Sequence, residues 1–405
     1  MATNNNDKTL NVPHLRFPEF TGEWKKVLLG QIANITKGNG ISKEQLSDQG
    51  TPCILYGELY TKYKSEIINE IYSKTALNSS SLVKSQANDV IIPCSGETAI
   101  DISTARCVPY NNILLGGDLN IIRLKSQDGG FFAYQLNGVR KHDIARIAQG
   151  VSVVHLYGEN LKKIKVFYPS IEEQRKITSL LSLIDERIAT QNKIIEKYES
   201  LIQAVIYQKK TDGIRMGDWQ KTELSKVLQE RNEKNINGYD VCSVSVSQGV
   251  VNQIEYLGRS FAAKETSHYN VVKYGDIVYT KSPTGNFPYG IVKRSCIKDG
   301  VAVSPLYGVY MPANDHIGVI LHFYFMQPNN ASNYLHPLIQ KGAKNTINIT
   351  NRRFLENSIP LPKTENEALC IANALKTIQK KIDTEKGLLQ SYEKEKEYLL
   401  CRMFI

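Results

Sequence analysis

Polar side chains in short loops are the residues of this 405-residue sequence whose types and spacing could do chemistry. Several of the loops follow short β-branched segments, such as 54–56, 90–92 and 120–124, which predict β-strands. Hydroxyl, amide and carboxylate groups at strand ends can exchange hydrogen bonds with a partner, and lysines can contact anions. The candidates are Thr36, Lys37, Asn39, Tyr56, Ser95, Glu97, Thr98, Ser152, Lys281, Ser282, Thr284, Asn286, Lys341, Lys344 and Asn345.

The sequence lacks the motifs on which common catalytic sites are built. No Asn-Pro-Pro-Tyr or Asp-Pro-Pro-Tyr methyltransferase loop, phosphate loop, dinucleotide-binding glycine motif, zinc-protease helix or hydrolase nucleophile motif occurs. The seven histidines form no cluster with metal-ligand spacing, and His322, which lies in an aromatic run, is expected to be a core residue. We therefore predict a non-catalytic chain that binds and positions a partner, with no metal and no cofactor of its own.

Composition describes a globular, basic protein. The formal net charge is +10, and residues 22–170 and 211–362 each carry an excess of +4. Such an excess favours a phosphate-bearing partner only weakly when it stands alone. The seven cysteines are scattered without a Cys-x-x-Cys pair, which is typical of reduced thiols in the cytoplasm. No signal peptide or membrane-spanning run is recognised in the sequence, so we expect a cytoplasmic protein without a membrane partner.

The elements that must position these loops occur twice. Residues 22–24 (Gly-Glu-Trp) return as 217–219 (Gly-Asp-Trp), and residues 131–150 match 323–342. The matches keep their order along the chain and differ by only a few inserted residues. A period this long indicates a duplicated domain-plus-helix unit rather than a solenoid repeat. Such a unit can fold with approximate two-fold symmetry.

Each copy ends in a long helix with apolar residues spaced alternately by four and three, the spacing of a coiled-coil seam. The residues expected to pair the helices are Ile177, Leu181, Ile184, Ile188, Ile195, Tyr198, Ile202, Ile371, Leu375, Ile378, Ile382, Leu389, Tyr392 and Leu399. We predict helices of roughly 35–40 residues that pair with each other. Leu180, Ile194 and Leu201 widen the first stripe, which predicts either a docking face for other subunits or packing on the neighbouring head.

These patterns predict an α+β chain of five segments. They are an N-terminal leader (1–21), a first α/β domain (22–168), a central helix (169–210), a second α/β domain (211–362) and a C-terminal helix (363–405). The two similar domains would be separated by two long antiparallel coiled-coil helices, with pseudo-two-fold symmetry.

The start of the central helix carries a family resemblance. Residues 169–177 (Pro-Ser-Ile-Glu-Glu-Gln-Arg-Lys-Ile) introduce an Ile- and Leu-rich helix and resemble the conserved helical region of the specificity subunit of Type I restriction-modification systems. Residues 24–38, 89–96 and 150–169 resemble the target recognition domains of the same family. The second copy, from Pro362, departs from the pattern because it lacks the Glu-Gln pair.

The resemblance implies that each domain is a target recognition domain that reads one half of a bipartite site on double-stranded DNA. The helices would set the spacing of the half-sites and dock two modification subunits, and restriction subunits would join the larger complex. S-adenosylmethionine, ATP and Mg2+ would be bound by those partners, which would supply adenine-N6 methylation and ATP-dependent DNA cleavage.

Under this reading the loops listed above contact DNA. The phosphate candidates are Lys37, Lys281, Lys341 and Lys344, and the base-edge candidates are Asn39, Glu97, Thr284, Asn286 and Asn345. Two other readings stay open from the residues: a coiled-coil adaptor that binds protein partners without reading DNA, and a self-contained modification enzyme. The second would require methyl-donor motifs that the sequence lacks.

Overall fold

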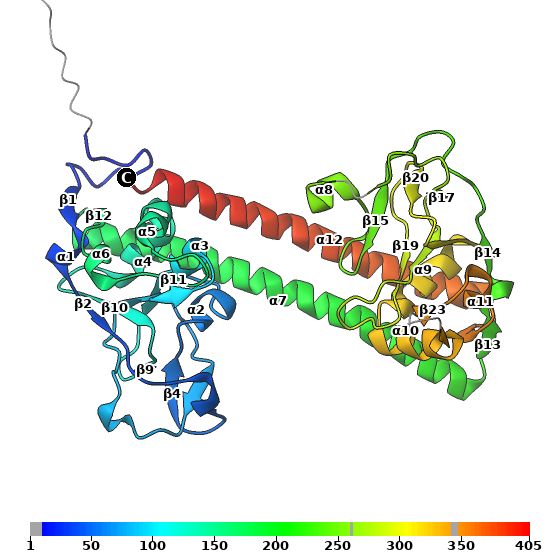
Figure 1. Cartoon of the computed structure of the whole chain (residues 1–405), viewed down its shortest axis with the longest axis horizontal. Coiled ribbons are helices and arrows are strands. Elements are labelled where there is room, and N and C mark those ends of the chain that lie inside the picture. The colour runs from blue at the N-terminus through cyan, green and yellow to red at the C-terminus, as the bar shows by residue number, and fades with distance from the viewer. Residues whose placement is uncertain (1–9, 260–261, 342–346) are drawn as a thin grey trace, which may run out of the picture. The chain divides into compact units, whose positions relative to one another are not determined.

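The computed structural model describes residues 10–259, 262–341 and 347–405, and it divides into two compact units. The first unit comprises Met1–Asn192 with Gly387–Ile405, and the second comprises Lys193–Lys386. Two long helices, α7 (Ile171–Met216) and α12 (Glu365–Arg402), contribute to both units (Figure 1). They contain 46 and 38 residues, so the first helix is longer than its heptad pattern predicts.

Each unit is built around a four-stranded antiparallel sheet with the same strand order, as the duplication predicts. In the first unit the order is β2 (Ala33–Lys37), β10 (Leu119–Leu124), β6 (Asp89–Pro93) and β8 (Arg106–Val108). In the second unit it is β14 (Leu228–Glu230), β21 (Gly308–Pro312), β18 (Ile277–Thr280) and β19 (Ile291–Arg294).

A second shared feature is the antiparallel ribbon that opens and closes each α/β domain. It pairs β1 (Lys25–Leu28) with β12 (Lys165–Tyr168) in the first unit, and β13 (Trp219–Glu223) with β24 (Ser358–Pro362) in the second. The closing strand leads directly into the long helix in both cases, so the ribbon fixes where each domain meets its helix.

The smaller elements differ more between the units. The first unit adds the sheet of β3 (Leu46–Ser47), β5 (Ser73–Thr75), β4 (Thr51–Ile54) and β9 (Leu114–Leu115), the ribbon of β7 (Ser95–Gly96) and β11 (Val154–His155), and the helices α1 (Leu29–Ile32), α2 (Glu58–Thr61), α3 (Ala99–Ile102), α4 (Gly129–Asn137), α5 (Lys141–Ile147) and α6 (Gly158–Leu161). The second unit adds the ribbons of β15 (Cys242–Ser245) with β16 (Gly249–Asn252), β17 (Asn270–Val272) with β20 (Val301–Val303) and β22 (Gln340–Lys341) with β23 (Ile347–Asn348), and the helices α8 (Gln253–Leu257), α9 (Asp315–Phe325), α10 (Pro328–Leu335) and α11 (Asn351–Phe354). The strand predicted at 54–56 lies earlier in the chain than expected, because β4 spans Thr51–Ile54 and Tyr56 lies in the turn that follows.

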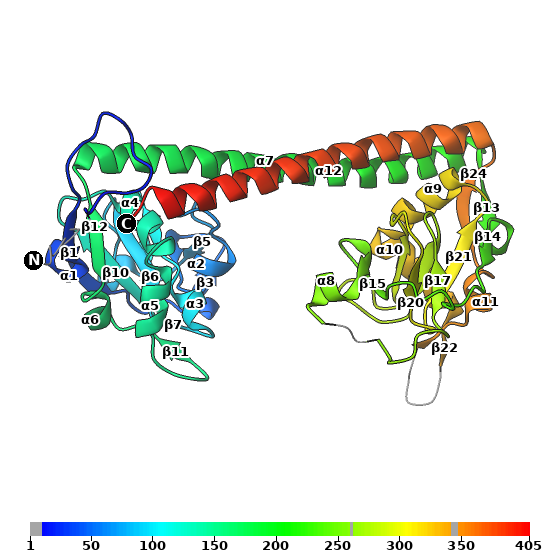
Figure 2. The same ribbon diagram turned by 90° about the horizontal axis from the view of Figure 1, so that it is seen from above.

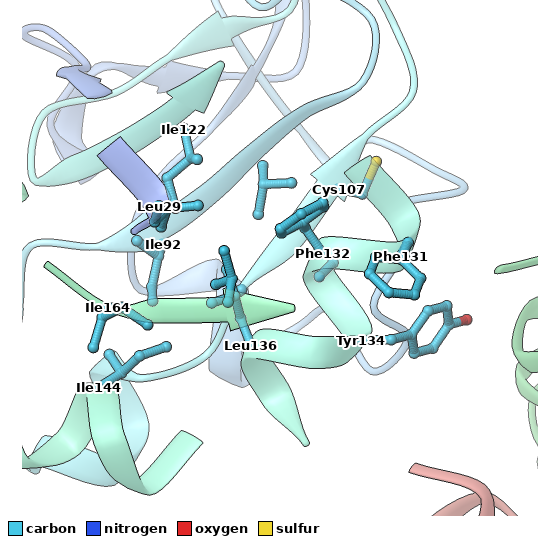
Figure 3. Packing of buried hydrophobic residues seen from close by; sticks show 14 of the residues in the cluster. Leu29, Ile92, Cys107, Ile122, Phe131, Phe132, Tyr134, Leu136, Ile144 and Ile164 are labelled. Carbon is cyan, nitrogen blue, oxygen red and sulfur yellow. The ribbon is translucent and has the colours of Figure 1, made fainter. Parts of the chain in front are cut away.

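The main core of the first unit forms around α4, in which every residue from Gly129 to Leu136 is buried. Its Phe131, Phe132 and Leu136 are fully buried among side chains of β6 and β10 (Figure 3). A large apolar side chain contributes roughly 1.5–3 kcal/mol when it is fully buried. Met403 and Phe404, at the end of the chain, belong to the same cluster. The core of the first domain is therefore completed by the C-terminal residues.

A tryptophan–glutamate contact anchors each domain to its long helix. In the first unit Trp24 Nε1 donates to Glu173 Oε1 (3.3 Å), and in the second Trp219 Nε1 donates to Glu367 Oε1 (2.8 Å). Arg16 of the leader adds two hydrogen bonds of 2.7 Å to Glu173. The Glu-Gln pair of the sequence motif thus faces its own domain.

Gln174, the second member of that pair, has a fully buried side chain. It accepts a hydrogen bond from Asp128 N (3.0 Å) and donates to Gln127 (2.6 Å) and to the Pro169 carbonyl (3.0 Å). The matching position of the second helix is Ala368, which is also buried and needs no polar partner. The missing Gln of the second copy therefore reflects a different domain surface at this point.

The residues predicted to pair the helices all lie on the protected side of α7 and α12. Eight are buried and the others are half-buried: Ile188, Tyr198, Ile378, Leu389, Tyr392 and Leu399. Ile177 and Leu181 belong to the core cluster of the first domain, so the start of this stripe packs on the domain. Leu183 and Leu201, by contrast, are exposed.

Contacts between the two helices run antiparallel within the first unit. Lys396 Nζ lies 2.6 Å from Asp185 Oδ1, and the Arg187 guanidinium lies over the ring of Tyr392. As the residue number rises along α12, the number of the residue that it contacts on α7 falls, which is the pattern of antiparallel helices. In the second unit Lys386 Nζ contacts Glu199 Oε1 at 2.9 Å, and both side chains are half-exposed.

A buried ion cluster joins α12 to the first domain. Lys396 Nζ lies 2.6 Å from both Glu66 Oε2 and Asp185 Oδ1, and the Tyr134 hydroxyl donates to Asp185 Oδ2 (2.7 Å). Arg106 Nη1 approaches Glu66 Oε1 at 4.0 Å. Burial acts to raise the pKa of Glu66, but Lys396 and Arg106 outweigh it and lower that pKa; burial and Glu66 raise the pKa of Asp185. The two carboxylates thus share one lysine, and Arg106 supplies a second positive charge beside Glu66.

Candidate nucleic-acid interface

In the first unit, the ends of three strands meet at one edge of the main sheet. Lys37, at the end of β2, pairs with Asn120 at the start of β10, and Leu119 pairs with Pro93 at the end of β6. Because these strands are antiparallel neighbours, the loop after β2 and the loop after β6 leave the sheet side by side. The structure therefore brings two of the predicted loops, 36–39 and 95–98, to a common edge, which we call the loop edge.

The third predicted loop joins the same edge through the short ribbon of β7 and β11. Ser95 pairs with His155, and Leu156 N donates to the Cys94 carbonyl (2.7 Å). Gln149 and His155 exchange two backbone hydrogen bonds of 2.9 and 2.7 Å, which closes a hairpin over 149–155. Figure 2 shows that the segment next to β11 projects on the side of the first unit that faces away from α7.

Tyr60 of α2 connects the fourth predicted loop, 56–58, to this edge. The Tyr60 hydroxyl lies 3.8 Å from the positions that a Cβ would take on Gly57 and on Gly96. Burial raises the pKa of Tyr60, and Tyr56 adds to that rise, as do the nearby carboxylates of Asp101 and Glu97. A phenol that stays protonated can donate a hydrogen bond at neutral pH.

Six of the eight candidates of the first unit are exposed, which suits contact with a partner: Thr36, Lys37, Asn39, Glu97, Thr98 and Ser152. Two of these also shape the loops, since Asn39 donates to the Ser81 carbonyl (3.3 Å) and the Thr98 hydroxyl accepts from Asp101 N (3.1 Å) as the N-cap of α3. Tyr56 is half-buried, and Ser95 is buried in the ribbon.

The second unit presents an equivalent edge. Glu230 at the end of β14 pairs with Tyr310, and Tyr279 near the end of β18 pairs with Gly308 at the start of β21. Lys281 follows β18 directly and is half-buried. Burial lowers its pKa, and Glu230 opposes that change. A lysine at this strand end is placed to contact a phosphate oxygen.

The loop after Lys281 forms a tight turn whose side chains point to solvent. Thr284 and Phe287 exchange two backbone hydrogen bonds of 3.1 and 2.9 Å, and Gly285 takes a positive φ of 51°. Ser282, Thr284 and Asn286 are all exposed. This turn holds three neighbouring polar groups in a fixed order.

The last predicted loop of the second unit lies at the β22–β23 ribbon. Lys341 pairs with Ile347 in that ribbon, which places its backbone at the base of the loop. Lys344 and Asn345 lie outside the described residues. Among the described residues, no three His, Cys, Asp or Glu side chains come together in a way that could hold a metal ion. No helix in the described parts of the chain is both long and apolar enough to cross a bilayer.

Sequence reasoning missed four side chains at the first loop edge: Tyr60, Val151, His155 and Tyr157. The rings of His155 and Tyr157 stack at a centroid distance of 6.2 Å and are both exposed. Their positions follow the ribbon pairing of β7 with β11, which depends on contacts between segments about 60 residues apart. The feature of the sequence that could have identified these side chains is the aromatic pair His155 and Tyr157, next to the Gln149–Ser152 loop.

Comparison with known proteins gives the same assignment from independent evidence. Residues 21–200 match the family model described as the Type I restriction modification DNA specificity domain. The chain is 23% identical over 418 residues to the Type I restriction enzyme MjaVIII specificity subunit of Methanocaldococcus jannaschii, covering 95% of this chain and 92% of that relative.

The fold agrees with a crystal structure of the Type I restriction-modification system S subunit from M. genitalium. The TM-score is 0.63 at 14% identity, and the match covers 97% of this chain and 99% of that one. Residues 21–200 therefore carry a Type I restriction modification DNA specificity domain, and nearly the whole chain is similar to a specificity subunit of these systems.

Proposed function

We propose that each of the two units reads one half of a bipartite DNA site through its loop edge. The observation that carries the proposal is the repeated sheet, in which β2, β10 and β6 correspond to β14, β21 and β18 and direct polar loops to the same edge. Exposed lysine, hydroxyl and amide groups there match what phosphates and base edges require.

The proposal assigns separate tasks along the chain. The domains at 22–168 and 211–362 would serve as target recognition domains, and the helices from 169–210 and 363–405 would set the spacing of the half-sites. Half-sites one helical turn of DNA apart require a separation of about 34 Å on one face of the duplex. A stiff helix pair fixes such a distance better than a flexible linker.

The same proposal covers the assembly. Two modification subunits would dock on the domains and helices, and restriction subunits would complete the enzyme. S-adenosylmethionine, ATP and Mg2+ would be held by those partners, which would carry adenine-N6 methylation and ATP-dependent cleavage in the cytoplasm. The match to a DNA specificity domain and the similarity to a specificity subunit do not favour the alternative of a coiled-coil adaptor without DNA recognition.

Methylation mapping tests the reading of DNA directly. The chain is co-expressed with its cognate modification subunit, and methylated adenines are located in the host genome. We expect copurification and a single motif made of two short blocks around an unspecified spacer. Failure to copurify, or methylation without a two-block motif, would refute the proposal.

The contribution of the first loop edge is tested with two lysines of the same sheet. Lys37 lies at the loop edge, whereas Lys125 follows the opposite end of β10 and donates to the Gln31 carbonyl (3.1 Å). Replacing Lys37 by Ala should weaken DNA binding and reduce the slope of log K against log salt by about 1. Lys125→Ala should leave that slope unchanged, and equal slopes for the two variants would remove Lys37 from the interface.

A further inference from the structure

The tip of the 149–155 hairpin carries an apolar side chain in an unusual setting. Val151 is 96% exposed, although the loops around it are polar. Gly150 has a φ of 122°, and a Cβ at that position would lie 2.1 Å from the Val153 carbonyl oxygen. Together with the two backbone hydrogen bonds between Gln149 and His155, this glycine closes the turn that carries the tip. Val151 is therefore presented to solvent at the tip of a closed hairpin.

Single exposed apolar residues are common on protein surfaces, so the position of Val151 carries the argument. The hairpin continues the β7–β11 ribbon, which leaves the sheet at the loop edge beside Ser95 and Glu97. A two-stranded ribbon has the width that a DNA major groove admits. The side chain at the tip of such a ribbon reaches farthest toward the floor of the groove.

Base edges in the major groove present one apolar group, the 5-methyl of thymine. An exposed valine can remove that methyl from water, and neighbouring hydroxyls such as that of Ser152 can bond to the adjacent polar groups. Val153 is 52% exposed and lies on the same hairpin, which extends the apolar contact. We propose that Val151 is a specificity-determining residue that reads a thymine in the half-site of the first unit, and this proposal rests on the proposed function above.

The experiment uses the assembled complex of this chain with its modification subunit and a duplex that carries the mapped target. Each thymine is replaced in turn by uracil, which removes only the 5-methyl group, and the dissociation constant is measured by fluorescence anisotropy. The wild-type complex should bind one of the uracil duplexes about fourfold more weakly than the thymine duplex. This is the effect expected when about one methyl or methylene group is no longer removed from water on binding. Val151→Ala removes two methyl groups and should weaken binding of the thymine duplex by roughly five- to fifteenfold.

The decisive result is the combination of the two changes. The Val151→Ala complex should lose no further affinity when that same thymine becomes uracil, whereas Val151→Ile should keep the uracil penalty. Val12→Ala, which makes the same chemical change at an exposed valine of the leader, should behave as wild type.

Other outcomes overturn the proposal in distinguishable ways. If every uracil substitution costs Val151→Ala as much as wild type, Val151 does not read a thymine, although sequence-specific binding by the wild type would leave the proposed function intact. If Val151→Ala fails to copurify with the modification subunit, the tip contacts protein instead. If the wild-type complex does not prefer the mapped target over a scrambled duplex, the proposed function itself fails.

Discussion

Replacing Lys396 by Met would test whether the buried ion cluster holds α12 against the first domain. The lysine side chain is 15% exposed, and the two carboxylates that it contacts, Glu66 and Asp185, are 8% and 6% exposed. Methionine has a similar volume but supplies no charge, so two buried carboxylates would lose their common cation. Removing one partner of a buried ion pair typically costs 3–5 kcal/mol. Arg106 remains 4.0 Å from Glu66 and offsets part of the loss, so we expect about 3 kcal/mol.

The pH dependence of this loss has a defined sign. Lys396 helps to hold the pKa of Glu66 below its ordinary value and opposes the rise in the pKa of Asp185. Without the lysine, both folded-state pKa values rise, and both groups can fold without a charge once they are protonated. The stability difference between wild type and Lys396→Met should therefore be largest near pH 7 and shrink as the pH falls toward 4.

The assay is urea unfolding followed by tryptophan fluorescence. A Trp219→Phe background leaves Trp24, which lies in the core of the first unit, as the reporter. Lys162→Met is the matched control in the same unit, because Lys162 and its partner Glu159 are 39% and 79% exposed. An exposed pair contributes about 0–1 kcal/mol. A loss in Lys396→Met no greater than that of the control, or one that does not change with pH, would refute the reasoning.

Three further predictions concern stability and are checked by the same unfolding assay, with each unit followed through its own tryptophan. Glu173→Ala should lower the free energy of unfolding by about 3 kcal/mol, because it removes a buried acceptor from an arginine and a tryptophan. Glu367→Ala should lower it by about 1 kcal/mol, because only the corresponding tryptophan bond is lost. Equal losses in the two variants would contradict this difference. Burial, with nearby cations, lowers the pKa of His322 to about 3, so the folded state binds fewer protons than the unfolded state and stability should fall as the pH drops from about 6.5. His322→Gln should flatten that fall. An unchanged pH profile of stability in this variant would contradict the role of His322. Gly213→Ala should destabilise the second unit, because its Cβ would lie 1.9 Å from a ring atom of Trp219. Gly387→Ala has no atom within 4 Å of the new Cβ and should stabilise its helix by up to about 1 kcal/mol. If Gly213→Ala left the stability unchanged, the tryptophan ring would have to move aside.

The sequence was most informative where the physical cause is local. Heptad spacing predicted both long helices, because residues three and four apart share a helix face whatever surrounds them. The repeated Gly-x-Trp signal lies at the opening strands β1 and β13, and Trp24 and Trp219 occupy matching places against Glu173 and Glu367. The loop candidates followed from strand ends, which short β-branched runs mark well.

Features that depend on distant contacts were not accessible from the sequence. Lys396 occupies a seam position where the first helix has Ile202, and its role depends on Glu66, which lies 330 residues earlier in the chain. Val151 resembled an ordinary turn residue, because its exposure depends on the pairing of β7 with β11. The Glu-Gln motif resembled a helix start, yet its side chains are occupied by the domain that precedes them.

The place of Met403 and Phe404 in the first core has a consequence for how a ribosome delivers this protein. The second unit is one continuous stretch of chain and can close as soon as it has been translated, but the first must wait until Met403 and Phe404 have been made. At about 5–20 residues per second, that wait spans the synthesis of the whole second unit. A product that stops before Met403 would display an open apolar surface, on which chaperones and proteases act. Closure of the first unit is thus coupled to translation of the segment that follows the second unit.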